Sequence, residues 1–347
     1  MGFLQTRSTV RRIFRALGLF FFYLTAVFLT LWAIAALYID LSPGSLHFLS
    51  AASYLLVVVL LVFRARTHFH RFLVCAAMFG LVLAAWLSLK PTNNRPWQND
   101  VAKTAWAEVN ADDVTIHNFR YCHYRAEFDY TCDWLTRTFK LSGLRGIDIA
   151  ITYWGSPYIA HPIVSFWFGG TDYVAASIET RRPVGLGYSA IRGFFRKYEL
   201  IYLFSDERDI VRLRTNFRSG EEVYLYRTTA GPGWSRKLFL EYIQQANELR
   251  DHPEWYNALT RNCTTVIFHF MRSIGPLPDG TSRFDWRILL NGRADEMLYN
   301  GGNFNSKLPF AELKQAAHIN DSARKADDFP DFSRLIRIDR PGFEDSH

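Results

Sequence analysis

The 347-residue chain contains few of the residues that define several non-globular classes of protein. It has 21 glycines and 13 prolines, too few for a collagen repeat or for a disordered chain rich in both. Its four cysteines are too few for a disulfide framework that replaces a hydrophobic core. We therefore expect a protein held together mainly by the packing of apolar side chains.

Excess charge is missing from most of the chain, although its formal net charge is +7. Residues 1–90 contain eight Lys or Arg residues and a single acidic residue, Asp40. Residues 91–347 contain 32 basic and 32 acidic residues, so this longer part is neutral. A nucleic-acid-binding protein usually carries its positive charge on the folded domain. We therefore expect no nucleic-acid partner.

Three long segments near the N-terminus lack charged residues altogether. Ala16–Ile39 has 24 residues, and Leu46–Phe63 and Phe72–Leu89 have 18 residues each. A membrane-spanning helix needs about 20 predominantly apolar residues. A signal peptide is disfavoured, because its apolar region has about 7–15 residues and no further spans follow it. Residues 1–90 are therefore predicted to form a three-helix transmembrane anchor.

Seven of the eight basic residues of the anchor lie on one side of the predicted spans, and the eighth, Lys90, follows the third span. The loop Asp40–Ser45 contains no Lys or Arg, whereas basic residues precede the first span and separate the second from the third: Arg7, Arg11, Arg12, Arg15, Arg64, Arg66 and Arg71. By the positive-inside rule, the N-terminus is cytoplasmic and the chain from residue 91 onward lies outside. In a Gram-negative bacterium this describes a multi-pass inner-membrane protein with a periplasmic domain.

The rest of the chain is predicted to form one domain, residues 99–320, between a linker at 91–98 and a polar C-terminal tail at 321–347. Strand-like segments rich in Ile, Val and aromatic residues come first, and segments with helical spacing follow. The strands are 146–154, 161–168, 173–180 and 200–204, and the helices are 236–250 and 262–274. This order predicts an α+β fold with an antiparallel sheet.

Two other patterns concern charge and cysteine. The closely spaced charges of Asp206–Arg214 predict an exposed, salt-bridged helix. Cys122 and Cys132 flank a predicted strand–turn–strand segment, 121–134. In an oxidising compartment they are able to form a disulfide, and free thiols are the alternative.

Cys263 stands at the start of a predicted helix, directly after Asn262. Because Asn is a favourable N-cap residue, Cys263 takes the first helical position. There the helix dipole stabilises a thiolate, and the unpaired amides of the first turn are able to bind an oxyanion. The alternative interpretation is a small side chain buried in the core.

His161 and Glu179 are predicted to face each other across a hairpin. A three-residue loop at Gly169–Thr171 places His161 directly opposite Glu179. A carboxylate in this position would orient the imidazole and raise its basicity. A two-residue loop would instead place Ile178 opposite His161, so this hypothesis depends on the register.

Four sequence motifs carry a resemblance to a known family. They are AHPIVSFWFGGTDYVAASIETRR at 160–182, KYELIYLFSDERDIVRLR at 197–214, YNALTRNCTT at 256–265 and DWRILLNG at 285–292. Together they resemble the periplasmic domain of the Lnb-type lipoprotein N-acyltransferase family. The resemblance implies a papain-like, circularly permuted fold in which the histidine strand precedes the cysteine helix. It also implies a catalytic site made of Cys263, His161 and Glu179.

Other residues are weaker candidates for the same site. Asn262, Thr264, Tyr153 and Ser165 are candidates for oxyanion binding or for support of the site. Arg120 and Arg181 are candidates for contacts to an anionic substrate. The alternative interpretations are an N-cap for Asn262, packing within the sheet for Tyr153 and Ser165, and solvated surface charge for the arginines.

Three functional hypotheses remain open at this stage. The first is a thiol acyltransferase that forms a thioester on Cys263 and passes the acyl group to an amine, with a phospholipid or lipoprotein as substrate. The second is a periplasmic cysteine peptidase or amidase acting on peptidoglycan or envelope proteins. The third is a non-catalytic envelope module. None of the three requires a metal or a cofactor.

Overall fold

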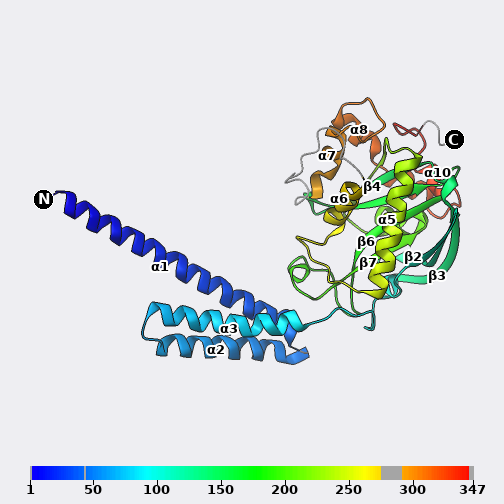
Figure 1. Ribbon diagram of the computed structural model, residues 1–347. Helices are drawn as coiled ribbons and strands as arrows, with labels where there is room; N and C mark the ends of the chain where they lie inside the picture. The colour runs from blue at the N-terminus through cyan, green and yellow to red at the C-terminus, as the bar shows by residue number, and fades with distance from the viewer. Residues whose placement is uncertain (1, 43, 275–290, 344–347) are drawn as a thin grey trace. The chain divides into compact units, whose positions relative to one another are not determined.

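The computed structural model describes residues 2–42, 44–274 and 291–343. These residues form two compact units (Figure 1). The first, the membrane unit, comprises Met1–Pro91 together with Ile191–Lys197. The second, the globular unit, comprises Thr92–Ala190 and Tyr198–His347.

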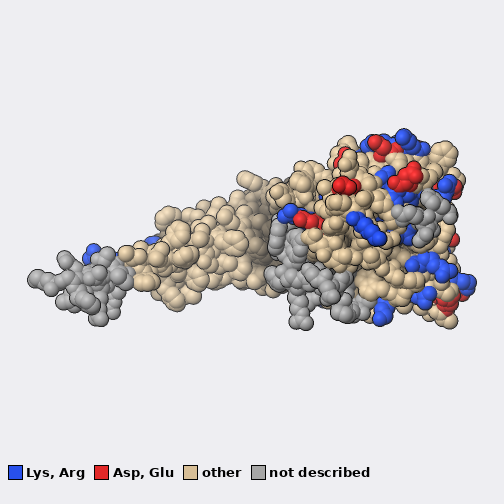
Figure 2. Space-filling view, turned by 90° about the horizontal axis from the view of Figure 1, so that it is seen from above, with Lys and Arg blue, Asp and Glu red and all other residues tan. Residues whose placement is uncertain are grey.

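The membrane unit contains three apolar helices at the positions where the sequence predicts spans. They are α1 (Gly2–Ala36), which continues into the short helix η1 (Leu37–Leu41), α2 (His47–Arg64) and α3 (His68–Ser88). All three are long and apolar enough to cross a membrane. In Figure 2 their visible surface is almost free of charged side chains, which instead gather on the globular unit.

Segment Ile191–Lys197 is separated in sequence from the helices but packs against their ends. The backbone amide of Arg196 donates a hydrogen bond to Asp40 at 2.8 Å. The guanidinium of Arg196 donates to the backbone carbonyls of Trp86 and Leu89. The ammonium of Lys197 donates to the carbonyl of Ile39 at 2.9 Å. These cations occupy the C-terminal ends of helices, where the helix dipole is negative.

An eight-stranded sheet forms the centre of the globular unit. Its strands are β1 (Trp106–Asn110), β2 (Asp113–Ala126), β3 (Asp129–Lys140), β4 (Gly146–Trp154), β5 (Ser156–Trp167), β6 (Tyr173–Arg181), β7 (Glu199–Ser205) and β8 (Glu221–Arg227). The order is β1-β2-β7-β6-β5-β4-β8, and β3 pairs with β2. The α+β class is confirmed, but the expectation of a purely antiparallel sheet is wrong. Strands β2 and β7 run parallel, which makes the sheet mixed.

Helices cover the sheet in two separate layers. Helices α5 (Pro232–Asp251) and α6 (Cys263–Ile274) pack on one apolar cluster, with Phe166 and Phe239 at its centre. Helices α4 (Glu207–Arg212), α9 (Asn320–Ala326) and α10 (Phe332–Leu335) pack on a second cluster around Ile163. The other described helices are α7 (Ala294–Asn300) and α8 (Phe310–Ala317).

Both ends of the expected domain differ from the sequence-based boundaries. Residues 92–98 are not a free linker, because the amide of Thr92 donates to Glu199 and Trp97 is buried. The described part of the expected polar tail is also integrated into the globular unit. Phe332, Ile336 and Phe343 are buried there despite the polar composition around them.

A buried ion network connects the C-terminal segment to the sheet. The guanidinium of Arg337 donates to Asp148 on β4 at 2.9 Å and to Glu207 on α4 at 2.7 Å. All three side chains are almost completely excluded from solvent. Burial alone would raise the pKa of Glu207, yet the Arg337 charge holds this pKa below its ordinary value. The network therefore depends on Arg337 to compensate buried carboxylates.

Replacement of Arg337 by alanine is expected to lower the free energy of unfolding by about 3–5 kcal/mol, because Glu207 loses its buried cationic partner and Asp148 keeps only Arg227. Arg334→Ala is the matched control in the same C-terminal segment, since the Arg334 guanidinium forms an exposed ion pair with Asp331. Its loss is expected to cost less than about 1 kcal/mol. Urea unfolding of the full chain in detergent measures both. Equal effects of the two variants would contradict the role assigned to Arg337.

Candidate active site

Cys263 occupies the first position of α6, as the sequence predicts. The side chain of Asn262 accepts a hydrogen bond from the amide of Thr265 at 2.9 Å, and the Thr265 hydroxyl accepts from the amide of Asn262. This reciprocal cap fixes the start of the helix. The amides of Cys263 and Thr264 lie in the first turn, where no intrahelical acceptor exists. They are therefore suited to bind negative charge beside the sulfur.

The hairpin of β5 and β6 has the register expected from its three-residue loop. Ile163 lies opposite Ser177, and Trp167 lies opposite Tyr173. Beyond this ladder the side chains of His161 and Glu179 meet, with 3.1 Å between Nε2 and Oε1. Ser177 contacts both residues, at 2.7 Å from the imidazole Nε2 and 2.9 Å from the carboxylate. The imidazole is thus held in one orientation by two polar partners.

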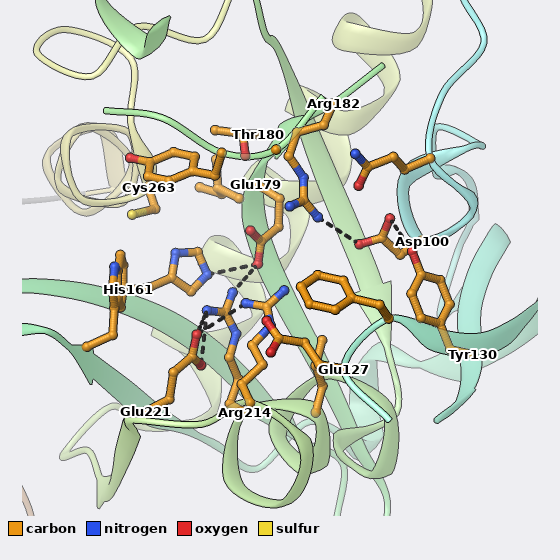
Figure 3. Close-up of a pocket in the computed structure, with 18 of the residues that line it drawn as sticks. Asp100, Glu127, Tyr130, His161, Glu179, Thr180, Arg182, Arg214, Glu221 and Cys263 are labelled. Carbon is orange, nitrogen blue, oxygen red and sulfur yellow. Dashed lines mark hydrogen bonds and ion pairs between the residues drawn. The ribbon is translucent and has the colours of Figure 1, made fainter. Parts of the chain in front are cut away.

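A line of alternating charges continues behind the imidazole (Figure 3). Arg214, in the short helix η6 (Leu213–Phe217), donates to Glu179 at 2.9 Å. Its other terminal nitrogen lies 3.4 Å from Glu221, which also pairs with Arg218 at 3.3 Å. Because Glu179 touches both His161 and Arg214, it cannot move without breaking two charged contacts.

The electrostatic surroundings favour a charged imidazole. Burial would lower the pKa of His161, but the negative charges of Glu179 and Cys263 and a hydrogen bond with Cys263 raise it to about 9. Burial would raise the pKa of Glu179, but the His161 and Arg214 charges hold it well below its ordinary value. At neutral pH the site therefore contains a buried imidazolium–carboxylate pair beside a cysteine.

The cysteine and the histidine open into a common pocket. Cys263, His161, Glu179 and Arg214 all line a cavity of about 370 Å³. Its other walls combine charged and aromatic side chains, among them Asp100, Glu127, Phe128, Tyr130, Arg182, Tyr188, Arg218, Glu221 and Tyr256. This size is sufficient for part of a small organic substrate.

A comparison with protein-family models matches residues 130–292 to the Lnb N-terminal periplasmic domain. This part of the chain is therefore an Lnb-type domain. The matched region includes Cys263, His161, Glu179 and Arg214. Searches of the curated proteins and of the solved structures each found no match. The matched domain suggests a periplasmic envelope protein, and the three apolar helices fit a protein of the inner membrane.

The motif at 285–292, which contributes to the Lnb-type resemblance, lies mostly outside the described residues. The other three motifs form β5, β6, β7, α4 and the start of α6. They therefore supply the histidine, its carboxylate partner and the cysteine. The circularly permuted, papain-like arrangement that the resemblance implies stays a prediction.

Two of the expected supporting residues lie away from the pocket. Tyr153 packs against Tyr224 and beneath the ammonium of Lys314, which lies 4.1 Å from its ring. Ser165 is buried on β5 and donates to Glu207. Neither belongs to the pocket lining, and both are buried within the sheet.

Asn262 and Thr264 do adjoin the cysteine. The Asn262 amide group donates to the carbonyl of Ala258 at 2.7 Å, while its oxygen caps α6. Both functions of the side chain are therefore used within the fold. The Thr264 hydroxyl lies 3.9 Å from the sulfur of Cys263 and is the nearer candidate for support.

The expected contacts of Arg120 and Arg181 with an anionic substrate are not supported. Arg120 is buried in a two-pronged pair with Asp209, at 2.9 and 2.7 Å. Arg181 is also buried and donates to the carbonyls of Val101 and Ala102. The segment Asp206–Arg214 is likewise not the exposed helix that its charges suggest, because Glu207 and Asp209 are fully buried.

Ser177 and Arg214 are the site residues that sequence reasoning missed. Ser177 was detectable, because it precedes Glu179 by two residues and therefore shares its face of the strand. Arg214 gave no such signal, since its proximity to Glu179 is a product of the fold.

Cys122 and Cys132 lie opposite each other on β2 and β3 and form a disulfide. Within the described residues, His, Cys, Asp and Glu form no group suited to a metal ion.

The raised pKa of His161 predicts a specific pH dependence of stability. Below pH 6.5 both the folded and unfolded chains bind the His161 proton, so the stabilisation is complete. Between pH 6.5 and about 9 the unfolded chain releases the proton first, and stability falls. The total loss is on the order of 3 kcal/mol. Urea unfolding in this range measures it, with His161→Gln as the variant that lacks the slope. Identical slopes in both proteins would contradict the assignment.

Proposed function

We propose that this protein is a membrane-anchored, cysteine-dependent acyltransferase of the periplasm. The supporting observation is the position of Cys263 at a helix N-terminus, in one pocket with a buried His161–Glu179 pair. Such an arrangement places a nucleophilic thiol beside a group that can accept and donate a proton. The Lnb-type resemblance points to acyl transfer onto an amine, with a phospholipid or lipoprotein as substrate.

The first half of the reaction forms a thioester. The Cys263 thiolate attacks the carbonyl carbon of an acyl ester, and the negative charge that develops on oxygen rests near the amides of Cys263 and Thr264. The carbon–oxygen bond of the ester then breaks. The leaving alcohol takes its proton from the His161 imidazolium, which becomes neutral.

The second half transfers the acyl group to an amine. Neutral His161 accepts a proton from the amine as its nitrogen attacks the thioester carbon. The carbon–sulfur bond breaks, an amide forms, and the Cys263 thiolate returns beside an imidazolium. Glu179 and Arg214 stay charged throughout, and they hold the ring in place while its protonation changes.

Hydrolysis is the second candidate function, favoured by the polar side chains inside the pocket. Arg182, Arg218 and Glu221 line the same cavity as Cys263 and would admit water or a polar peptide. In this case water replaces the amine in the second half-reaction. Cys263, His161 and Glu179 would then serve a peptidase or an amidase of the cell envelope.

The membrane topology forms part of the proposal. Three spans with a cytoplasmic N-terminus place the globular unit in the periplasm, on the side where bacterial lipoproteins mature. The disulfide between Cys122 and Cys132 supports an oxidising compartment for this unit. An anchor keeps the enzyme at the surface that contains both acyl donor and acceptor.

Cys263→Ala is expected to abolish N-acylation of lipoproteins in a bacterial strain that depends on this protein for the reaction. His161→Gln is expected to reduce it at least about a hundredfold, because both proton transfers are lost. Mass spectrometry of a lipoprotein N-terminus measures the product. Cys75→Ala, which changes the other free cysteine, is the control and is expected to retain activity. Absence of product with the wild type, or its persistence with Cys263→Ala, would contradict the transferase.

A further inference from the structure

Strand β3 forms a long edge of the sheet in the globular unit. It pairs with β2, and no other strand pairs with it within residues 2–42, 44–274 and 291–343. Its 12 residues make it about twice as long as a typical strand, and they include neither Pro nor Gly. In Figure 1 it lies at the margin of the globular unit. A long edge of this kind presents backbone N–H and C=O groups that are able to pair with a further strand.

The other two edges of the sheet are covered by parts of the same chain. On β1, the backbone of Ala107 donates to and accepts from the side chain of Asn247 on α5, at 2.8 Å in both directions. On β8, the carbonyl of Val223 accepts from the amide of Ile319 at 2.9 Å, and its amide donates to Asn320 at 2.8 Å. Among the described residues, by contrast, the backbone of β3 is hydrogen-bonded to β2 alone.

The side chains at the middle of β3 alternate in a self-complementary way. Asp133, Leu135 and Arg137 are alternate residues of the strand and therefore share one face of the sheet. The Asp133 side chain is 65% exposed, and Leu135 is 41% exposed. Arg137 lies 3.8 Å from Asp206, and its side chain is still 35% exposed. An exposed apolar residue is thus flanked, at equal spacing, by one negative and one positive charge.

This pattern selects one register for the pairing of β3 with a second copy of itself. If Leu135 lies opposite Leu135 of the partner subunit, each Asp133 lies opposite Arg137 of the partner subunit, and the ion pair forms twice. A register centred on Asp133 or on Arg137 would place like charges opposite each other, which is destabilising. A register centred on Trp134 or on Thr136 would leave both charges opposite uncharged residues. Of these registers, the one centred on Leu135 alone pairs opposite charges.

We propose that the edge of β3 binds β3 of a second copy of this chain, antiparallel and with Leu135 at the twofold axis. Backbone hydrogen bonds join the two sheets, as in other cases of strand addition, and the Asp133–Arg137 pairs fix the register. Because both copies use the same surface, the contact closes at two subunits. This contact goes beyond the proposed function and does not depend on it. Strand β3 also supplies Tyr130 to the pocket that contains Cys263, so the partner lies on a strand that forms part of the pocket wall.

Charge reversal tests the contact through the pattern of association that it produces. Sedimentation equilibrium of the full chain in a density-matched detergent measures the dimer dissociation constant. Asp133→Arg alone and Arg137→Asp alone each place like charges opposite each other twice, and each is expected to weaken dimerisation at least about tenfold. In an equimolar mixture of the two variants, unlike charges meet at both positions of the mixed dimer. The mixture is therefore expected to recover wild-type association, which a misfolded variant would not do.

Asp321→Arg is the matched control for this experiment. Asp321 has an 82% exposed side chain and lies on α9, which adjoins β8 at the other end of the sheet, so its reversal is expected to leave the dissociation constant unchanged. A monomeric wild type, wild-type association of either single variant, or a mixture that associates no better than the single variants would each overturn the proposal.

Photo-crosslinking locates the contact independently of the charges. The full chain, with p-benzoylphenylalanine in place of Leu135, is irradiated in detergent and separated under denaturing conditions. Phe329, another exposed residue, receives the same replacement as the control. Covalent dimers are expected at least about tenfold more often from position 135 than from position 329, because residues at the twofold axis lie directly opposite each other. Equal yields, or crosslinked peptides without β3, would overturn the proposal.

Discussion

The contact between His161 and Glu179 is the interaction on which the candidate site depends. A buried imidazolium is unfavourable unless an anion compensates it, and Glu179 provides that anion at 3.1 Å. Glu179 is in turn held by Arg214, and Arg214 by Glu221. Each buried charge therefore has a partner, and removal of any inner member would leave an uncompensated ion. This chain of contacts fixes the ring that faces Cys263.

The same principle operates at a second place in the globular unit. Arg337 compensates Asp148 and Glu207, and so connects the C-terminal segment to β4 and α4. The two networks use residues from distant parts of the chain to neutralise charges within the fold. One network connects segments of the fold, whereas the other also holds an imidazole beside Cys263, which the proposed function uses for proton transfer. His161 shares its cavity with Cys263, whereas Arg337 lines a different cavity.

Local patterns predicted much of this arrangement. The loop Gly169–Thr171 determined the register of β5 and β6, and Asn262 determined the start of α6, because both effects act over a few residues. Long-range charge pairing was not predictable in the same way. Arg120 and Arg181 looked like free surface cations, and Asp206–Arg214 looked like an exposed helix, because a sequence does not show which distant partner neutralises a charge. The mixed sheet and the buried C-terminal segment escaped prediction for the same reason.

The central claim is that Cys263 carries an acyl group during the reaction. Intact-mass spectrometry of the purified full chain, after brief incubation with an ester donor and no amine, measures this directly. We expect a mass increase equal to one acyl group, located on the Cys263 peptide and removed by hydroxylamine. Cys263→Ser removes the sulfur and is expected to show no thioester at position 263. An acyl adduct elsewhere, or full turnover of the donor by a protein without Cys263, would contradict the account.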